Sequence, residues 1–273
     1  MMQFVKTSPV SMGKFIRCFY SVFNAVAGEQ IMHHRLPDGT LDLVFNLGDP
    51  VAISGNGSDF YNMPGVSLTG LYRDRRFLSY QGRVHLVGVV FQPGAANLFV
   101  QQALADWSAS TADASGALGT DVYLWREQMA ELSSESEKHR LLESHLMKIL
   151  SKSFGRDRDM EKVLHAVQKI HDLKGHIQIE NLQRECLMSP RSFRRMFSER
   201  VGMGAKQYAE IIRVKAFCAN PHSLSEGYSE QLYDLGFTDH AHFNRAFRKI
   251  TGTSPTAYLQ GLQPLAARFT RLI

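Results

Sequence analysis

The chain is poor in cysteine: its 273 residues include only Cys18, Cys186 and Cys218. Three scattered cysteines are too few for a disulfide framework or a zinc site, so we expect a reducing, cytoplasmic setting. The sequence also lacks an apolar run of the ~18 residues that a membrane-spanning helix needs, and it shows no secretory signal. We therefore expect no membrane partner.

Signatures of enzymes are missing as well. The sequence has no Gly-x-Ser-x-Gly element, no Walker-type loop and no dinucleotide fingerprint. His33, His34 and His85 lack the spacing of a metal site, and a structural or surface role is expected for them. Cys18 lies in an apolar run, which favours a buried core cysteine over a reactive thiol. We expect no enzyme activity, no metal and no cofactor.

The net charge of +5 is unevenly distributed. Residues 1–153 hold 13 Lys and Arg against 14 Asp and Glu, a net charge of −1. Residues 154–273 hold 18 against 12, a net charge of +6. An excess of positive charge confined to one part of the chain favours a polyanionic partner for that part, nucleic acid first.

The length and a change of pattern along the chain predict two domains. Residues 41–47 and 83–91 are β-prone runs that end in turn signals. Residues 121–150 predict a helical hairpin, which packs either on its own domain or on a second subunit. We place a linker at residues 151–157 and divide the chain into residues 1–153 and 154–273. The fold class expected is α+β, with a β-rich first domain and an all-helical second domain.

An internal repeat lies in the second domain. Residues 189–209 align with residues 239–259 at a constant offset of 50, and both copies share the pattern Phe-x-Arg-x-Phe-x4-Gly-x5-Tyr. The two phenylalanines of each copy are four residues apart, so they fall on one helix face and anchor it. Ser189-Pro190 is a strong helix start, and Gly202 is suited to end that helix.

Each copy combines an apolar inner face with a donor-rich outer face. Arginine and asparagine are side chains that read guanine and adenine edges in a major groove. A short helix and a tight connection precede each copy, which is the layout of a helix-turn-helix unit. Two such units in a basic domain favour DNA binding over ordinary amphipathic helices with solvated charges.

On these residues, the segment from about 159 to 260 resembles the AraC/XylS-type transcriptional regulator domain. The resemblance is carried by residues 189–197 and 235–258, together with Tyr208 and Arg213. It implies two helix-turn-helix units joined by a long helix, with both recognition helices in successive major-groove segments, ~34 Å apart. Leu187 departs from the pattern, since a glycine is common at its place in the turn.

The resemblance implies base contacts and phosphate contacts by position. The base-contact candidates are Arg191, Arg194, Arg195, His240, Ala241, Asn244 and Arg245. The phosphate candidates are Lys206, Arg213, Lys215, Arg248 and Lys249. Phosphate contacts set affinity and salt dependence, whereas base contacts set sequence preference.

The first domain resembles the sensor-type domain that precedes some AraC-type DNA-binding domains, on residues 36–48, 68–70 and 88–95. A small β-barrel of cupin-like type is the expected architecture, and the implied role is effector sensing, dimerisation or both. Candidate effector contacts are Arg35, Tyr72, Arg73 and Arg75. The alternative for residues 72–76 is a solvated edge strand protected by its charges.

The sequence thus predicts a sequence-specific transcriptional regulator, an activator as the first expectation, that responds to an effector. The expected partners are double-stranded DNA, RNA polymerase, an unidentified small molecule and a second copy of the chain. The alternative is a small-molecule-binding protein or cupin-like enzyme whose helix-turn-helix domain has degenerated, as the atypical stretch Tyr228 to Leu232 indicates.

Overall fold

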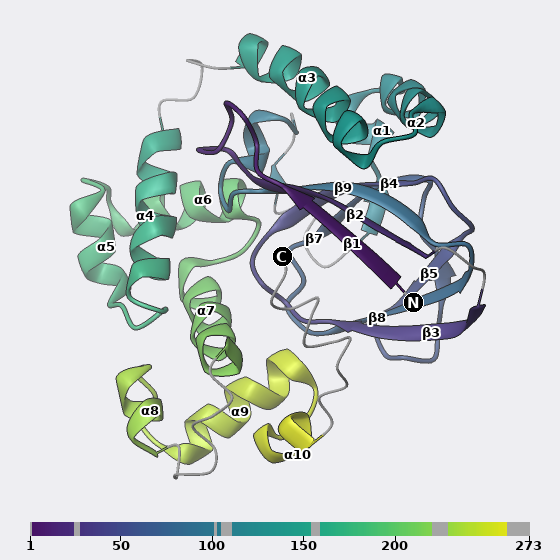
Figure 1. Ribbon diagram of the computed structural model, residues 1–273. Helices are drawn as coiled ribbons and strands as arrows, with labels where there is room; N and C mark the ends of the chain where they lie inside the picture. The colour runs from purple at the N-terminus through teal and green to yellow at the C-terminus, as the bar shows by residue number, and fades with distance from the viewer. Residues whose placement is uncertain are drawn as a thin grey trace.

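The computed structural model describes residues 2–24, 28–100, 103–104, 111–153, 159–219 and 229–260. A β-rich half is followed by a helical half, as the sequence predicts (Figure 1). The first half contains β1 (Met2–Thr7), β2 (Ile16–Asn24), β3 (Gly28–Arg35), β4 (Leu41–Asn46), β5 (Val51–Ser54), β6 (Tyr61–Asn62), β7 (Val66–Gly70), β8 (Arg76–Gly82), β9 (His85–Phe91), η1 (Ala96–Leu98), β10 (Thr111–Asp113), α1 (Ser115–Leu118), α2 (Asp121–Glu131) and α3 (Glu135–Ser153). The second half contains α4 (Met160–Asp172), α5 (Ile179–Glu185), α6 (Pro190–Val201), α7 (Ala205–Ala219), α8 (Ser229–Asp234), α9 (His240–Thr251) and α10 (Pro255–Gln260).

The strands form two antiparallel sheets. The larger sheet has the order β1-β2-β9-β4-β7-β10, and the smaller has the order β3-β8-β5-β6. Strand β4 is buried along its whole length because the larger sheet is covered on both faces. Leu43 and Phe45 belong to the core shared with the helices, whereas Val44 belongs to the core between the two sheets. Successive side chains of β4 therefore point alternately into the two cores.

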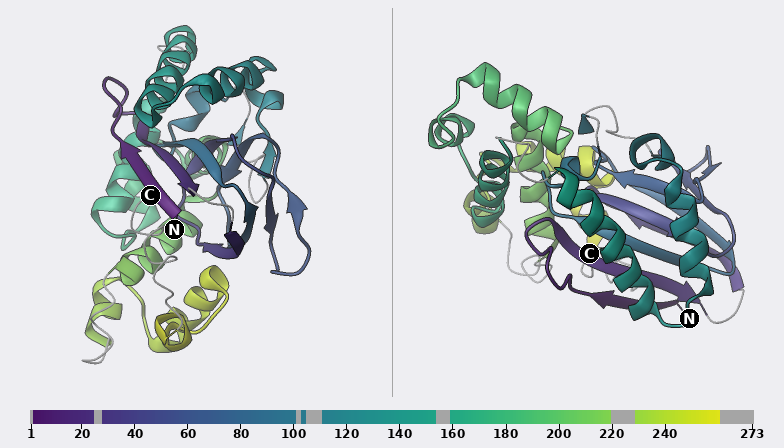
Figure 2. Two further views of the ribbon diagram at one scale, coloured as in Figure 1. Left: turned by 45° about the vertical axis from the view of Figure 1, so that its right-hand side comes forward. Right: turned by 90° about the horizontal axis from the view of Figure 1, so that it is seen from above.

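The predicted helical hairpin is confirmed as α2 and α3, and it packs on its own domain. Val122, Trp125 and Met129 of α2 lie in the same core as Phe45 of β4, with the Trp125 and Phe45 ring centroids 6.4 Å apart. Figure 2 shows both helices lying along one face of the larger sheet. Of the two placements left open for this hairpin, the structure shows packing on its own domain. Of the predicted linker, residues 151–153 belong to α3, and residues 154–157 lie outside the described residues.

The two halves share one continuous hydrophobic core, which includes residues of β4, α2, α4, α6, α7 and α9. Two glycines of the first half show how closely the two halves approach each other. A Cβ placed on Gly39 would lie 2.3 Å from the Tyr208 ring of α7, and one placed on Gly94 would lie 2.4 Å from Val163 of α4. The helical half is thus packed directly against one end of the β-rich half.

Candidate DNA-binding surface and interdomain cavity

Helix α6 is built from the signals that the sequence predicts. The Ser189 hydroxyl accepts a hydrogen bond from the Ser192 amide at the N-terminus, and Pro190 follows in the first turn. Gly202 ends the helix with φ 81°, in the left-handed region that glycine adopts without a steric penalty. Phe193 and Phe197 are fully buried, with ring centroids 5.7 Å apart. The helix is therefore capped at both ends and anchored along one face.

Helix α9 repeats this construction 50 residues later. Asp239 caps it by accepting from the His242 amide, and Gly252 ends it with φ 71°. Phe243 and Phe247 are fully buried, with centroids 5.4 Å apart. In both copies a tyrosine of the following helix meets the second phenylalanine edge-on: Tyr208 on Phe197, and Tyr258 on Phe247. The repeat seen in the sequence is thus a repeat of three-dimensional structure.

The base-contact candidates lie on the outer faces of these two helices. Arg191, Arg194 and Arg195 are exposed on α6, although the Arg194 Nε also donates to the carbonyl of Pro190. On α9, His240, Ala241 and Arg245 are exposed, and Asn244 is half-buried. Buried phenylalanines on one face and exposed donors on the other are what a recognition helix requires.

The phosphate candidates divide into two groups. Lys206, Arg248 and Lys249 are exposed, and Lys249 forms an ion pair with Glu210 at 3.3 Å. Arg213 is half-buried, lies over the Phe237 ring and donates to the carbonyl of Gly236 at 3.0 Å. It therefore supports the turn of the second unit, and its contact with phosphate stays a prediction. The Lys215 side chain lines a cavity between the two halves, and its contact with phosphate likewise stays a prediction.

This interdomain cavity lies between the two sheets and is closed at one end by α7 and α9. Its walls are mostly apolar, and they come from both sheets and from both helices. The lining residues include Val22, Val44, Val51, Leu78, Leu86, Val214 and Ile250. A concave apolar space with a few polar groups is the usual form of a small-molecule site.

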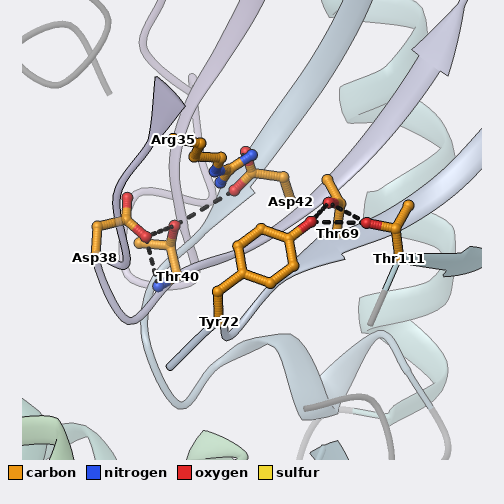
Figure 3. Close-up of polar contacts among 7 residues, drawn as sticks. All are labelled: Arg35, Asp38, Thr40, Asp42, Thr69, Tyr72 and Thr111. Carbon is orange, nitrogen blue, oxygen red and sulfur yellow. Dashed lines mark hydrogen bonds and ion pairs between the residues drawn. The ribbon is translucent and has the colours of Figure 1, made fainter. Parts of the chain in front are cut away.

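A buried ion pair forms the polar side of the cavity (Figure 3). The Arg35 guanidinium donates to the Asp42 carboxylate at 2.8 Å, and Asp42 is fully buried. Burial raises the pKa of Asp42 to about 6, although Arg35 opposes this rise. Burial also tends to raise the pKa of Asp38, but the charges of Lys215 and Arg35 and the hydrogen bonds from Thr40 hold it below its usual value. The charge of Arg35 is thus already balanced within the protein.

Lys215 lies under the influence of the Asp38 charge, and both residues line the cavity. Among the described residues, no ion pair or hydrogen bond of its ammonium group is found, and burial lowers its pKa while the charge of Asp38 opposes this. Tyr20 and Tyr80 are almost fully buried and line the same cavity. Their hydroxyls likewise make no hydrogen bond within the described part of the chain. The cavity thus presents the Lys215 ammonium together with the Asp38 carboxylate, and two hydroxyls that an occupant could bind.

Of the effector-contact candidates, Arg35 and Tyr72 line the cavity, whereas Arg73 and Arg75 do not. The alternative of a solvated edge strand for residues 72–76 is wrong. Tyr72 is buried, and residues 71–75 form the loop between β7 and β8, at the junction with the helical half. Tyr20, Tyr80 and Lys215 were not predicted to line a cavity. The alternation of Cys18, Tyr20 and Val22 marks them as one strand face, but it carries no sign that this face adjoins a cavity.

In the described residues, no group of three His, Cys, Asp or Glu side chains is placed to hold a metal ion. Within the same residues, no helix has the length and apolar character to cross a membrane. His33 is buried, and His85 contacts Glu135 at 3.1 Å.

Residues 182–261 match the family model of a helix-turn-helix domain, and residues 9–113 match a domain of unknown function (DUF6597). No curated protein matches the chain. Among solved structures, the chain is similar to ToxT from Vibrio cholerae, with 12% identity, a TM-score of 0.44, and 89% of this chain and 97% of that chain covered. A ToxT structure with bound unsaturated fatty acid gives 12% identity, a TM-score of 0.42 and coverage of 89% and 98%. The chain therefore carries an AraC-type helix-turn-helix domain over residues 182–261, behind a DUF6597 domain over residues 9–113.

Proposed function

We propose that the protein regulates transcription by reading two successive major-groove segments with α6 and α9. The observation that carries this proposal is the structural repeat. Two equivalent helices have the same caps and the same buried phenylalanine pair, and each presents exposed or half-buried donors outward. Arg195 and Arg245 occupy equivalent places on the two helices, and arginine is the side chain most often used to read guanine.

DNA selection with the full chain tests this proposal. We expect the protein to enrich one site from a random duplex library and to bind it with a strong salt dependence. Arg195→Ala should weaken binding to the selected site by about 1–3 kcal/mol and relax the preference for one base pair. Arg140→Ala, which removes an exposed arginine of α3, is the matched control and should leave affinity unchanged. An equal loss on random DNA would make Arg195 a phosphate contact, and no enriched site would refute the proposal.

We further propose that the interdomain cavity binds the effector, and that this effector is an apolar molecule with a carboxylate. Apolar walls favour an apolar body, and the ammonium of Lys215, which forms no ion pair among the described residues, favours an anionic head. Tyr20 and Tyr80 line the same cavity and could donate to that head. Burial of a charge is costly, so an anion that adds to the charge of Asp38 beside Lys215 would be bound with a gain in stability.

Thermal unfolding with matched alkyl ligands tests the cavity. Hexanoate at ten times its Kd should raise the Tm by about 3–5 °C, whereas hexanol should raise it less. Lys215→Met should abolish the difference between the two ligands. Lys206→Met on the exposed side of the same helix is the control and should retain it. A carboxylate response that survives in Lys215→Met would refute this assignment.

A homodimer and a contact with RNA polymerase stay predictions from the family resemblance, as does the choice of activation over repression. The alternative, a small-molecule-binding protein or enzyme with a degenerate DNA-binding domain, is disfavoured by one observation. Of the stretch that departs from the family pattern, residues 229–232 lie in α8 and Leu232 is buried, while Tyr228 lies outside the described residues.

A further inference from the structure

One loop of the first half touches the ends of both recognition helices. This loop, residues 71–75, connects β7 to β8 and is called here the β7–β8 loop. A Cβ placed on Gly202, at the end of α6, would lie 2.6 Å from Cδ1 of Leu71. A Cβ placed on Gly252, at the end of α9, would lie 2.5 Å from Nε of Arg75. The two contacts fall on positions that are equivalent in the 50-residue repeat.

Both contacts depend on the absence of a side chain. Gly202 and Gly252 are the left-handed residues that end the two helices, and the loop side chains occupy the space where a Cβ would stand. A surface groove continues the same junction: Arg73 and Asp74 of the loop line it together with Lys206 of α7 and Lys249 of α9. The loop therefore lies against both helix-turn-helix units at once.

The loop is itself held firmly in the first half. Leu71 is buried, and its amide donates to the carbonyl of Thr40 at 2.9 Å. Its φ of 52° is unusual for a leucine, and the surrounding contacts fix this strained conformation. The Arg75 guanidinium lies over the Phe77 ring at 4.7 Å, and that of Arg76 lies over the Tyr72 ring at 4.8 Å.

The opposite end of the second unit is held from within the helical half. Arg213 donates to the carbonyl of Gly236, and the His176 ring occupies the space beside Gly236, 2.4 Å from where a Cβ would stand. These contacts fix the turn before α9. Toward its far end, Lys249 pairs with Glu210 of α7 and the Phe247 ring packs on Phe217. The contact of Arg75 with Gly252 adds a hold on this end from the first half.

We propose that the β7–β8 loop is a spacer that fixes the relative placement of α6 and α9, with Leu71 and Arg75 as positioning residues. The first half of the protein then helps to set the distance between the two DNA segments that the second half reads. Tyr72 of the same loop lines the interdomain cavity. An occupant of the cavity and the spacing of the recognition helices therefore act on one another through the same five residues.

Spin-label distances in the full chain test the spacer without DNA. The labels are placed by Glu199→Cys on α6 and Arg248→Cys on α9, two exposed positions, in a Cys218→Ser background. Pulsed dipolar spectroscopy should give one narrow distance for the otherwise unchanged chain. Arg75→Ala should broaden or shift this distribution, whereas Arg140→Ala, which removes an exposed arginine of α3 away from the junction, should not. An unchanged distance in Arg75→Ala, or equal broadening in Arg140→Ala, overturns the proposal.

A second measurement connects the spacer to DNA reading, and this part alone rests on the proposed function. The selected duplex is compared with one that carries an extra base pair between the two segments, which rotates one segment by about 35° relative to the other. The unchanged chain should discriminate against the longer duplex about 10-fold, and Arg75→Ala less than about 3-fold. Equal discrimination by both proteins counts against the spacer. Failure to select any DNA site counts against the proposed function, and the spin-label result still decides on the loop.

Discussion

At the scale of single residues, Leu187 stands out because it combines two unfavourable features. It adopts φ 52° in the turn before α6, and its side chain is 90% exposed. A left-handed conformation costs an L-residue roughly 1–2 kcal/mol, and an exposed side chain recovers little of this through packing. Glycine would adopt the same conformation freely, at the cost of more entropy lost on folding.

We therefore expect Leu187→Gly to stabilise the protein by about 0.5–1 kcal/mol, seen as a higher urea midpoint at unchanged slope. Leu173→Gly is the matched control. Leu173 is also exposed, but its φ of −91° is ordinary, so the glycine should only destabilise there. Equal effects of the two substitutions would show that backbone strain at Leu187 is not the cause.

The sequence predicts residues well where a local rule decides their role. The Ser189 cap, the terminal Gly202 and the buried phenylalanine pairs follow from helix chemistry and from a spacing of four residues, and all are found. Lys215 could not be predicted to line a cavity. Its contacts depend on how α7 docks against β-strands that lie far away in the sequence, and no local pattern encodes that docking.

At the scale of elements, the end of α6 shows how a glycine serves both the helix and its neighbour. Gly202 has φ 81°, and an added Cβ would lie 2.6 Å from Leu71 and 3.1 Å from the carbonyl oxygen of Leu104. Two residues later, Gly204 has ordinary φ, and nothing lies within 4 Å of an added Cβ. The two glycines thus offer opposite environments on one short connection.

Gly202→Ala should destabilise the protein by roughly 2–4 kcal/mol, because backbone strain adds to the displacement of Leu71. Gly204→Ala should be neutral or stabilise by about 0.5 kcal/mol through the unfolded state. Thermal unfolding of both variants compares them directly. A loss at Gly202 no larger than that at Gly204 would contradict the close contact with the first half.

Helices and strands whose apolar residues recur at a regular spacing are also well predicted. The elements against which they pack are not. The run at residues 41–47 and the hairpin at 121–150 appear as β4, α2 and α3. For the stretch at residues 72–76, the edge-strand interpretation is wrong, whereas the effector-contact interpretation stays a prediction, with Tyr72 lining the cavity. Charged residues indicate a surface position in a sequence, and Arg73 is exposed, but Arg75 is half-buried against the end of α9.

At the scale of the whole molecule, the shared core contains a titratable group. His171 of α4 is hydrogen-bonded to the hydroxyl of Tyr208 at 2.7 Å, and Tyr208 packs on Gly39 of the first half. Burial, with the charges of Lys215 and Arg17, lowers the pKa of His171 to about 4, while Asp172 and Asp38 act in the opposite direction. The folded protein therefore keeps this imidazole neutral.

Stability should fall as the pH drops from about 6.5 to 4, since the unfolded chain binds a proton at His171 that the folded chain excludes. This group adds up to about 1.4 kcal/mol per pH unit in that window and nothing further above it. His171→Gln should make the dependence of Tm on pH shallower, although buried His33, whose pKa is also lowered to about 4, keeps part of it. A wild-type slope in His171→Gln would exclude His171 as a source.

The contact between Gly39 and Tyr208 also affects how the chain folds while it is being synthesised. A ribosome makes about 5–20 residues per second, so roughly ten to thirty seconds separate the synthesis of these two positions. During that interval the end of the β-rich half that later receives α4, α6 and α7 has no cover from them. The nascent first half thus exposes an apolar docking face, which makes it a natural client for chaperones that hold unfinished chains.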